Sequence, residues 1–458
     1  MTSPERTRHV IAPSVGPEAP YPVVYSELDG VLFRIGRLLI QYQTLQAGEF
    51  IDRHAEARIR VALTDTRIVA VVGPRQSGKT TLVRHIAEHD HRPFITLDDE
   101  QSRHFALDDP AGFARGLDNV VIDEIQRSPD LILALKRAVD EDTRPGRFLV
   151  TGSVDLFKGA ISPDSLAGRV ETIELLPLSQ AEIAGLPPAG FLDRAFAGDF
   201  PRLEPTGPTV DLIERIVSGG FPEVLSRPAP ARRRAWLRSY ARSVASRDVL
   251  DIASVRKGAE LERLVDHAAL SAGNLLNLSS LASRLGLDSK TVDRWLVLLE
   301  HMFLVRRVRA WHRREVKRLV KAPKLHFLDS GLLAMLLRAD AARLAANRTM
   351  LGPLFECFVH GELAKAMALS EETTTVSHYR DKDGVEVDLV LERSPGVVVG
   401  IETKAAATVR PQDFRGLRRL RQSAGDGFAC GILLHDGERI QQVDTALFAI
   451  PLKMLWEA

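Results

Sequence analysis

The sequence contains very little cysteine. Only Cys357 and Cys430 occur among its 458 residues, and they lie far apart in the chain. Two isolated thiols are too few for a disulfide framework or a cysteine-based zinc site, and they suit a reducing compartment. The 13 histidines are scattered, with no H-E-x-x-H motif. We therefore expect no transition-metal centre.

Long hydrophobic runs and a net charge are also lacking. No run of about 18 apolar residues occurs, and the first residues, MTSPERTRHV, lack the apolar stretch of a signal peptide. We expect a cytoplasmic protein without a membrane partner. The 61 basic and 60 acidic residues leave a net charge of +1, so charge over the whole chain indicates no particular partner. A hydrophobic content of 45% is ordinary for globular domains, and the length allows two or three of them.

Short apolar runs alternate with helical patterns in the first half of the chain. This alternation predicts an α/β fold, a parallel sheet with helices on both faces. The expected strands are residues 68–72, 94–97, 120–122 and 148–150.

A glycine-rich motif follows the first of these runs. Residues 73–80, GPRQSGKT, match G-x-x-x-x-G-K-[ST] between a strand and a helical pattern. Glycines let the backbone N–H groups converge on phosphate oxygens, and the helix start adds partial positive charge. Lys79 is expected to reach the β- and γ-phosphates and Thr80 to bind Mg²⁺. The predicted nucleotide-binding residues are Gly73, Pro74, Arg75, Gln76, Ser77, Gly78, Lys79, Thr80 and Thr81.

Two carboxylates end a second strand. Asp123 and Glu124 follow Val120–Ile122 at the strand's carboxyl end, the edge at which ligands of open α/β sheets lie. Asp123 is the candidate for the Mg²⁺ shell, and Glu124 for the general base that polarises water. Sustained hydrolysis needs a group that orients water, so the pair of acids predicts an ATPase with ATP and Mg²⁺ as its ligands.

Two further candidates follow. Ser153 ends the strand at 148–150 and is a candidate for sensing the γ-phosphate, although an ordinary turn serine fits as well. Arg169 is a cation that could stabilise the transition state, in its own chain or in a neighbouring one. Its position in the sequence does not separate that role from a structural salt bridge.

The motifs together resemble a known family. GPRQSGKTTL, VVIDEIQRSPDLILALK, LVTGSVDLF, LAGRVETIELLPLS and GGFPEVL are similar to segments of bacterial and archaeal AAA-type ATPases with a carboxy-terminal domain of unknown function. The resemblance covers residues 50–458. It implies a P-loop ATPase domain, followed by parts that are expected to bind DNA and to contain a nuclease-like fold.

The predicted organisation has four parts. Residues 1–48 form an amino-terminal arm, in which 31–40 is interpreted as a surface helix. Residues 49–205 form the AAA-type P-loop ATPase domain, 206–345 a helical and winged-helix region, and 346–458 a restriction-endonuclease-like α/β domain. The oligomeric state is not predicted.

The middle region contains a helix-turn-helix pattern. In 278–299, Gly286 makes the turn, Asp288 or Ser289 caps the second helix, and Lys290 and Arg294 remain outside. The residues expected to face the core are Leu281, Leu285, Val292, Leu296 and Leu299. A basic stretch follows and suits DNA phosphates: Arg306, Arg307, Arg309, Arg313, Arg314, Lys317, Arg318, Lys321 and Lys324. A protein-docking module or a lid on the ATPase is the alternative.

Carboxylates recur near the carboxy terminus. Asp388 and Glu402 lie on two expected strands of a hairpin, and Lys404 shares the face of Glu402 as a cation that could activate water or stabilise the transition state. The spacing D-x(13)-E-x-K resembles the restriction-endonuclease-like superfamily, which implies a metal site and a helical glutamate, Glu356 or, failing that, Glu362. A fold that retains DNA binding without cleavage is the alternative.

The sequence thus predicts an ATP-binding and ATP-hydrolysing AAA-type protein that associates with DNA and has a metal-dependent, nuclease-like carboxy-terminal domain. The competing interpretation is a regulatory ATPase whose carboxy-terminal regions bind a protein partner and have no nuclease activity.

Overall fold

The computed structural model describes ten segments of the chain: residues 9–11, 24–28, 31–34, 50–153, 168–200, 212–245, 258–313, 318, 321–393 and 396–457. Its contacts divide the chain into two units, Met1–Thr44 and Leu45–Ala458. In the first unit, β1 (His9–Ile11), β2 (Val24–Leu28) and β3 (Val31–Arg34) form an antiparallel sheet. The prediction of a helix over 31–40 is therefore wrong at its first four residues, and the rest lies outside the described segments.

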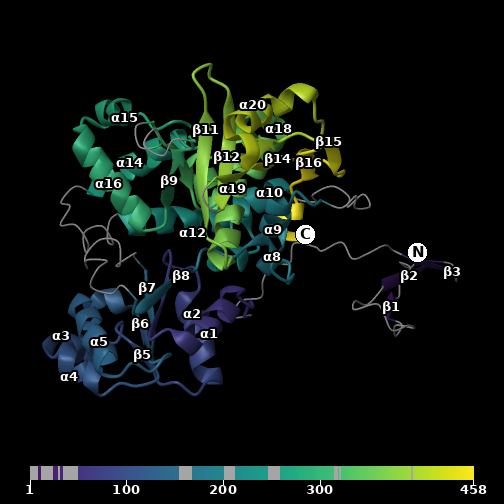
Figure 1. Ribbon diagram of the computed structural model, residues 1–458. Coiled ribbons are helices and arrows are strands. Elements are labelled where there is room, and N and C mark those ends of the chain that lie inside the picture. The colour runs from purple at the N-terminus through teal and green to yellow at the C-terminus, as the bar shows by residue number, and fades with distance from the viewer. Residues whose placement is uncertain are drawn as a thin grey trace, which may run out of the picture. The chain divides into compact units, whose positions relative to one another are not determined.

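A parallel five-stranded sheet organises the first part of the second unit (Figure 1). Its order is β5-β6-β7-β4-β8, so the strand before the glycine-rich motif lies between β7 and β8. The predicted strands are present, and β8 is an additional edge strand. The bounds are β4 Ile68–Val72, β5 Phe94–Thr96, β6 Val120–Asp123, β7 Phe148–Gly152 and β8 Val170–Glu174.

Helices cover both faces of this sheet, as predicted. Successive side chains of a strand point to opposite faces. Val69 and Val71 therefore pack with α1 and α2, whereas Ile68 and Ala70 pack with α3, α4 and α5. The bounds are α1 Ala55–Asp65, α2 Lys79–His89, α3 Glu100–Asp108, α4 Pro110–Arg115, the 3₁₀ helix η1 Ile125–Arg127 and α5 Pro129–Glu141.

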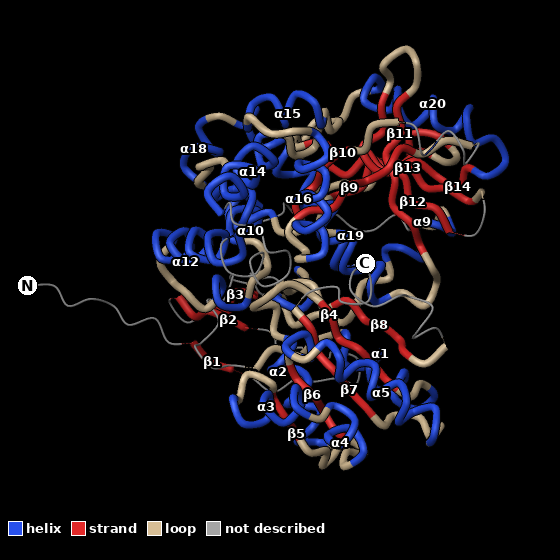
Figure 2. The backbone as a smooth tube through the Cα atoms, turned by 90° about the vertical axis from the view of Figure 1, so that its left-hand side faces the viewer, coloured by secondary structure: helices blue, strands red, loops and turns tan. Residues whose placement is uncertain are grey.

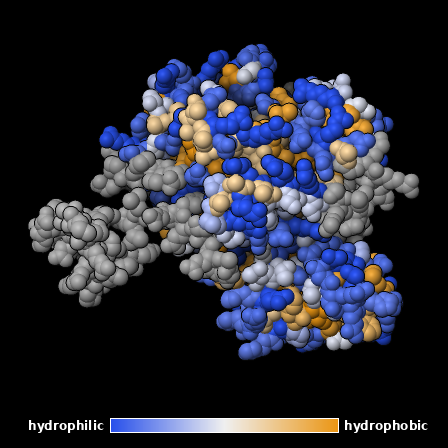
Figure 3. Space-filling model, turned by 180° about the vertical axis from the view of Figure 1, so that it is seen from behind, coloured by the Kyte–Doolittle hydropathy of each residue, from blue (hydrophilic) through white to orange (hydrophobic). Residues whose placement is uncertain are grey.

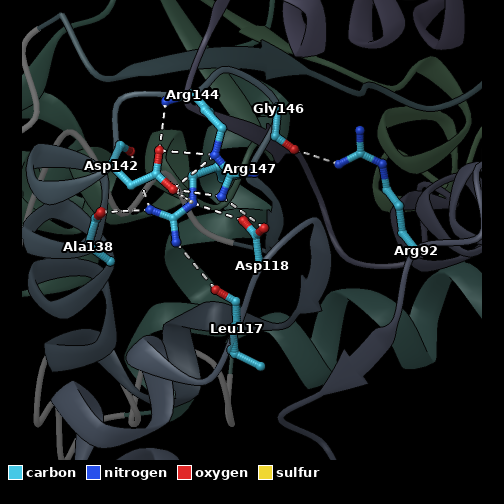
Figure 4. A network of polar contacts seen from close by, with 8 residues as sticks. All are labelled: Arg92, Leu117, Asp118, Ala138, Asp142, Arg144, Gly146 and Arg147. Carbon is cyan, nitrogen blue, oxygen red and sulfur yellow. Dashed lines mark hydrogen bonds and ion pairs between the residues drawn. The ribbon is translucent and has the colours of Figure 1, made fainter.

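A polar network lies at the amino ends of β6 and β7 (Figure 4). The buried guanidinium of Arg147 donates to the carboxylate of Asp118 at 3.0 Å. It also donates to the carbonyls of Ala138 at 2.7 Å, Asp142 at 3.3 Å and Leu117 at 3.4 Å. These contacts satisfy carbonyls at the ends of helices and loops, and they lie at the edge opposite to the glycine-rich motif.

Helices dominate the middle of the chain. Among them, α15 and α16 form the predicted helix-turn-helix: Gly286 has φ 68° at the turn, and Asp288 accepts a hydrogen bond from the Thr291 N–H at 2.9 Å. All five residues expected to face the core are buried. The bounds are α8 Gln180–Ile183, α9 Phe191–Ala197, α10 Leu212–Ser218, α11 Pro222–Leu225, α12 Pro230–Ser243, α14 Gly258–Leu270, α15 Leu278–Leu285, α16 Ser289–His301, α17 Ser330–Leu336 and α18 Ala341–Ala346.

A mixed eight-stranded sheet organises the carboxy-terminal part (Figure 2). Its order is β10-β9-β11-β12-β13-β14-β16-β15. Residues of α19 and α20 contribute to two different hydrophobic clusters with this sheet. The bounds are β9 Val305–Ala310, β10 Lys324–Phe327, the 3₁₀ helix η4 Arg348–Met350, α19 Leu351–Leu369, β11 Thr374–Arg380, β12 Glu386–Arg393, β13 Val397–Lys404, the 3₁₀ helix η5 Pro411–Phe414, α20 Arg415–Ala424, the 3₁₀ helix η6 Gly425–Gly427, β14 Phe428–His435, β15 Gln441–Asp444, β16 Leu447–Pro451 and α21 Met454–Glu457.

This sheet crosses the boundary predicted at residues 345 and 346. The hairpin β9–β10 follows the helix-turn-helix in sequence, yet β9 pairs in parallel with β11 through Ser377 and Arg309. The predicted winged-helix region therefore shares a sheet with the part that was expected to be a separate domain. The four domain limits stay predictions.

The surface seen in Figure 3 is mostly hydrophilic, with patches of hydrophobic residues between. Two large apolar side chains of α3, Phe105 and Leu107, are more than half exposed, at 57% and 52%. In the described part of the chain, no helix has the length and apolar character needed to cross a membrane.

Candidate functional site

The glycine-rich motif forms a loop between β4 and α2. Gly78 has φ 94°, a left-handed backbone that favours glycine, and Gln76 has φ 64°. A Cβ at Gly73 would lie 2.2 Å from the Leu175 carbonyl oxygen, so this glycine permits the close approach of two backbones. The loop is thus shaped by its glycines at both ends, as a phosphate-binding loop requires.

Lys79 is the first residue of α2, and its ammonium is folded back onto the loop. It donates to the carbonyls of Gly73 at 3.0 Å and Pro74 at 2.8 Å. Burial lowers its pKa to about 8, although Glu124 and Asp123 counteract part of the shift. An ammonium held by carbonyl dipoles beside the loop is positioned for a nearby anion. Of the other predicted loop contacts, Arg75 is half-buried and Thr81 is exposed.

Asp123 lies beside the loop at the carboxyl end of β6. The Thr80 hydroxyl donates to its carboxylate at 3.0 Å, the Thr151 hydroxyl at 2.6 Å and the Thr96 hydroxyl at 3.3 Å. The structure therefore brings together Thr80 and Asp123, the two predicted Mg²⁺ ligands. A hydroxyl and a carboxylate are hard oxygen donors of the kind that Mg²⁺ prefers. Thr151 lies in the segment LVTGSVDLF, but the sequence analysis assigned it no role. The contact of Thr96 was not predicted.

Glu124 follows in a strained backbone conformation. Its φ is 58°, uncommon for a residue with a side chain, and its N–H donates to the Thr151 hydroxyl at 3.0 Å. The Ser153 hydroxyl donates to its carboxylate at 3.1 Å, and the Gln126 amide also donates to it. Ser153 thus holds Glu124, whereas the sequence suggested a contact with phosphate. Gln126 was missed, because nothing in DEIQR marks it.

Arg169 lies at the other edge of the sheet. Its carbonyl accepts from the Ile68 N–H at 3.2 Å, at the start of β4, whereas the glycine-rich loop follows the end of β4. Five residues of strand separate the two edges by about 16 Å. Its guanidinium pairs with Asp140 at 2.5 Å. In this structure Arg169 therefore pairs with Asp140 at the end of the sheet away from the loop, and its role in stabilising the transition state, in its own chain or in a neighbouring one, stays a prediction.

A second polar cluster lies in the carboxy-terminal sheet. The buried ammonium of Lys324, on β10, donates to the Glu356 carboxylate of α19 at 2.9 Å and to Asp388 of β12 at 3.3 Å. Asp388 also accepts from the N–H and hydroxyl of Thr403, at 2.9 and 2.8 Å. The sequence placed Lys324 in a DNA-facing stretch and missed this role, because only the pairing of β9 with β11 brings β10 to the carboxylates.

Two carboxyl groups near Lys324, those of Glu356 and Glu402, hold protons more tightly than usual. Burial, together with the charge of Asp388, raises the pKa of Glu356 to about 8. Burial and Asp388 also raise the pKa of Glu402 well above its usual value. Conversely, Asp388 and Glu356 raise the pKa of Lys324 despite its burial. The cluster therefore retains bound protons at neutral pH.

Lys404 is not the cation of this cluster. Its ammonium binds Asp413, whose carboxylate also accepts from the Arg410 N–H at 2.7 Å. Glu362 is also occupied elsewhere, because it accepts from the Gln180 N–H at 2.9 Å and from the Lys365 ammonium at 2.6 Å.

The predicted metal role of Glu356, Asp388 and Glu402 gains no geometric support. Among the residues that the structure describes, no group of three or more histidine, cysteine, aspartate or glutamate side chains is arranged to hold a metal ion. The ammonium of Lys324 contacts both Glu356 and Asp388. This metal role stays a prediction.

Comparison with known proteins places these features in a family. A model described as an AAA domain matches residues 65–184, and models for two domains of unknown function, DUF8612 and DUF4143, match residues 209–343 and 351–455. The uncharacterized proteins Rv2008c of Mycobacterium tuberculosis and Mb2031c of Mycobacterium bovis are each 31% identical over 369 residues, 80% of this chain and 76% of theirs. The chain belongs to the AAA-type P-loop ATPase family with a carboxy-terminal DUF4143 domain.

Two solved structures are also similar to this AAA-type protein. The Walker-type ATPase paby2304 of Pyrococcus abyssi is 16% identical, with a TM-score of 0.37 over 64% of this chain and 97% of its own. The RuvB Holliday junction branch migration motor of Thermotoga maritima is 17% identical, with a TM-score of 0.27 over 58% of this chain and 94% of its own.

The basic stretch of this AAA-type protein is largely neutralised by its own acids. Arg306 pairs with Glu174 of the AAA domain at 2.9 Å, and Arg318 pairs with Glu392 at 2.6 Å. Arg307 also has acidic partners, Lys321 binds a carbonyl, and Lys324 is buried. Arg309 and Arg313 are exposed, and Arg314 and Lys317 lie outside the described residues. Several members of the stretch are therefore committed to partners within the chain, and its contact with DNA phosphates stays a prediction.

Proposed function

We propose that this protein binds ATP together with Mg²⁺ at the loop 73–80 and hydrolyses it. The observation that carries the proposal is the convergence of Lys79, Thr80, Asp123 and Glu124 at one edge of the parallel sheet, with Thr80 and Asp123 in direct contact. Membership of the AAA-type P-loop family supports the same conclusion. A single acid at this edge would suit a nucleotide switch, and the second acid favours turnover.

Each residue has a distinct role in this proposal. The loop N–H groups and Lys79 bind the phosphates, and the ammonium exchanges the carbonyls of Gly73 and Pro74 for phosphate oxygens. Thr80 and Asp123 would hold Mg²⁺, which supplies positive charge against the phosphates. Glu124 takes a proton from the attacking water as general base, and Ser153 sets the direction of its carboxylate.

Two substitutions test the proposal in a phosphate-release assay with Mg²⁺. We expect Lys79→Ala to abolish hydrolysis, because the charge that binds the phosphates is lost. Glu124→Gln is expected to lower kcat by about a hundredfold or more while ATP still binds, since general-base catalysis contributes about 10² to 10⁴ in rate. Normal turnover in Lys79→Ala would contradict the assignment.

We also propose that α15 and α16 contact DNA. This is supported by the exposed side chains of Lys290 and Arg294 on a helix whose other face is buried. The double variant Lys290→Ala, Arg294→Ala is expected to bind duplex DNA more weakly. Its affinity is also expected to change less with salt concentration, because two phosphate contacts are lost. If the intact protein fails to bind DNA at about 50 mM salt, and DNA does not stimulate ATP hydrolysis, the alternative of a protein partner for these regions takes its place.

DNA cleavage is not part of the proposed function. The ammonium of Lys324 occupies the space between Glu356 and Asp388, and Lys404 pairs with Asp413. Cleavage of linear, single-stranded or junction DNA in Mg²⁺ or Mn²⁺, lost in Asp388→Ala, would restore the nuclease interpretation.

A further inference from the structure

Arg53 lies just before α1 and is buried against the glycine-rich loop. Its guanidinium donates to the Ser77 carbonyl at 2.7 Å, to the Leu176 carbonyl at 2.7 Å and to the Glu182 carboxylate at 3.0 Å. Only 6% of its side chain is exposed. All three nitrogens of a planar fork are therefore committed, which fixes the orientation of the group.

The contact with Ser77 bears on the phosphate-binding N–H groups. In a planar trans peptide, the carbonyl of one residue and the N–H of the next point in opposite directions. The Ser77 carbonyl belongs to the same peptide unit as the Gly78 N–H. Because Arg53 holds that carbonyl, it also fixes the direction of the Gly78 N–H, which the motif places among the phosphate-binding donors.

Gly78 makes this approach possible. A Cβ at Gly78 would lie 3.3 Å from Nη1 of Arg53, and the residue has φ 94°. The glycine thus serves two purposes, a left-handed backbone and room for the guanidinium.

Glu182 anchors the other side of Arg53. Its carboxylate accepts from the N–H groups of Ser179 and His54, at 2.8 and 2.9 Å, as well as from Arg53. Burial opposes ionisation of this group, but Arg53 and these N–H groups outweigh it and hold the pKa of Glu182 below its usual value. Arg53 is therefore held by a charged partner outside the loop, and this partner belongs to α8.

We infer that Arg53 is a positioning residue for the phosphate loop: by holding the Ser77 carbonyl, it presets the Gly78 N–H for a nucleoside triphosphate. The inference rests on the proposed function. Arg53 touches no phosphate in this arrangement and acts through the peptide that joins Ser77 and Gly78. The loop is consequently organised before nucleotide binds, and binding does not have to order it.

The test is nucleotide affinity in Arg53→Lys, measured with a fluorescent methylanthraniloyl derivative of ATP well below the melting temperature of each variant. A lysine keeps the charge but cannot make three divergent hydrogen bonds. We expect Kd to rise about tenfold or more, the equivalent of one well-placed hydrogen bond. In ATP hydrolysis, KM is expected to rise more than kcat falls, because the Gly78 N–H binds the ground state and the transition state alike.

Arg147→Lys is the matched control. Arg147 is about as buried as Arg53, with 10% of its side chain exposed, and donates to carbonyls and an acid at the opposite edge of the same sheet (Figure 4). Both variants are expected to melt at lower temperature than the natural protein. Only Arg53→Lys is expected to lose nucleotide affinity, and an equal loss in Arg147→Lys would reduce Arg53 to a structural role.

A milder variant covers the case in which Arg53→Lys does not fold. Glu182→Gln removes the anchoring charge but leaves Arg53 in place, and we expect a smaller loss of affinity in the same direction. Unchanged affinity in both Arg53→Lys and Glu182→Gln would overturn the inference while the proposed function stands. Failure of the natural protein to bind the fluorescent nucleotide would instead overturn the proposed function itself.

Discussion

The contact between Ser153 and Glu124 assigns a measurable role to a serine. Its hydroxyl lies 3.1 and 3.2 Å from the two carboxylate oxygens of Glu124. A general base must be aimed at its water, so loss of the hydroxyl is expected to lower kcat by about tenfold or more, within the 10² to 10⁴ that the base itself contributes. Steady-state ATPase kinetics of Ser153→Ala are expected to show an almost unchanged KM.

Ser128→Ala serves as the control for this prediction. Ser128, between η1 and α5, is as deeply buried, and its hydroxyl donates to the Ala106 carbonyl of α3 at 3.0 Å. Its removal is expected to change stability without changing kcat. A normal kcat in Ser153→Ala would show that Gln126 alone positions Glu124.

Residue order along the chain was sufficient to predict that Lys79, Thr80, Asp123 and Glu124 converge, because parallel strands bring their carboxyl ends to one edge. Lys79, Thr80, Asp123 and Glu124 each end or follow such a strand. The hydrogen-bond and ion-pair partners of such side chains were harder to predict from the sequence. Whether Ser153 turns to Glu124 or to a phosphate, or Lys404 to Asp413 or to Glu402, depends on rotamers and packing that no sequence spacing records.

Two buried histidines connect β10 with α19. The rings of His326 and His360 stack with centroids 4.7 Å apart, and within the described part of the chain neither ring has a hydrogen-bond partner. Burial is the main cause that lowers the pKa of His360 to about 3, and the charge of Arg306 adds to it. Burial also lowers the pKa of His326 well below its usual value, so both histidines are neutral in the folded protein at neutral pH.

This burial predicts a loss of stability in acid. The folded protein keeps His360 neutral down to about pH 3, whereas the unfolded chain binds a proton near pH 6.5. Below about pH 6.5 the unfolded state thus binds more protons, and the free energy of unfolding falls as the pH falls. His360 alone is expected to account for about 2 kcal/mol at about pH 5. Urea unfolding at about pH 7 and about pH 5 measures the difference.

The variant His360→Leu isolates this contribution. Its free energy of unfolding is expected to decrease less between the two pH values, by about the amount given for one histidine. At neutral pH the variant is expected to lose little, because a buried ring without hydrogen-bond partners contributes mainly packing. An unchanged pH dependence would show that His360 is not the titrating group.

Secondary structure was predictable where a helix or strand carries its own pattern. The apolar spacing, the turn glycine and the capping aspartate of α15 and α16 are local signals, and the structure confirms them. The acidic partners of the basic stretch after them could not be predicted, because they are distant in sequence. Arg306 meets Glu174, 132 positions away, and Arg318 meets Glu392, 74 positions away.

At the scale of the whole molecule, the eight-stranded sheet predicts which truncations are tolerated. A fragment ending at residue 345 would keep β9 and β10 but lose β11 and the strands beyond it. The edge of β9 and the buried cluster residues of β10 would then be exposed, which favours aggregation. We expect this fragment to be insoluble or to elute as aggregates in size-exclusion chromatography.

The converse result would be informative about the predicted domain limits. A monomeric, cooperatively melting fragment 1–345 would show that the β9–β10 hairpin is stable without its neighbours. The boundary at 345 and 346 would then mark a true domain limit, as the sequence predicted.

Helix α19 contacts both the carboxylate cluster and the segment around α8. Near its carboxyl end, Glu362 and Lys365 bind the backbone of Gln180 and Leu178, in the segment that Arg53 joins to the glycine-rich loop. Six residues earlier, Glu356 contacts Lys324 in the carboxylate cluster. That separation is about 9 Å along a helix axis, too short for the rod to bend appreciably. Any shift that nucleotide imposes on the 175–182 segment would therefore move α19 as a rigid body and displace Glu356. In this way α19 would couple the glycine-rich loop to the carboxylate cluster.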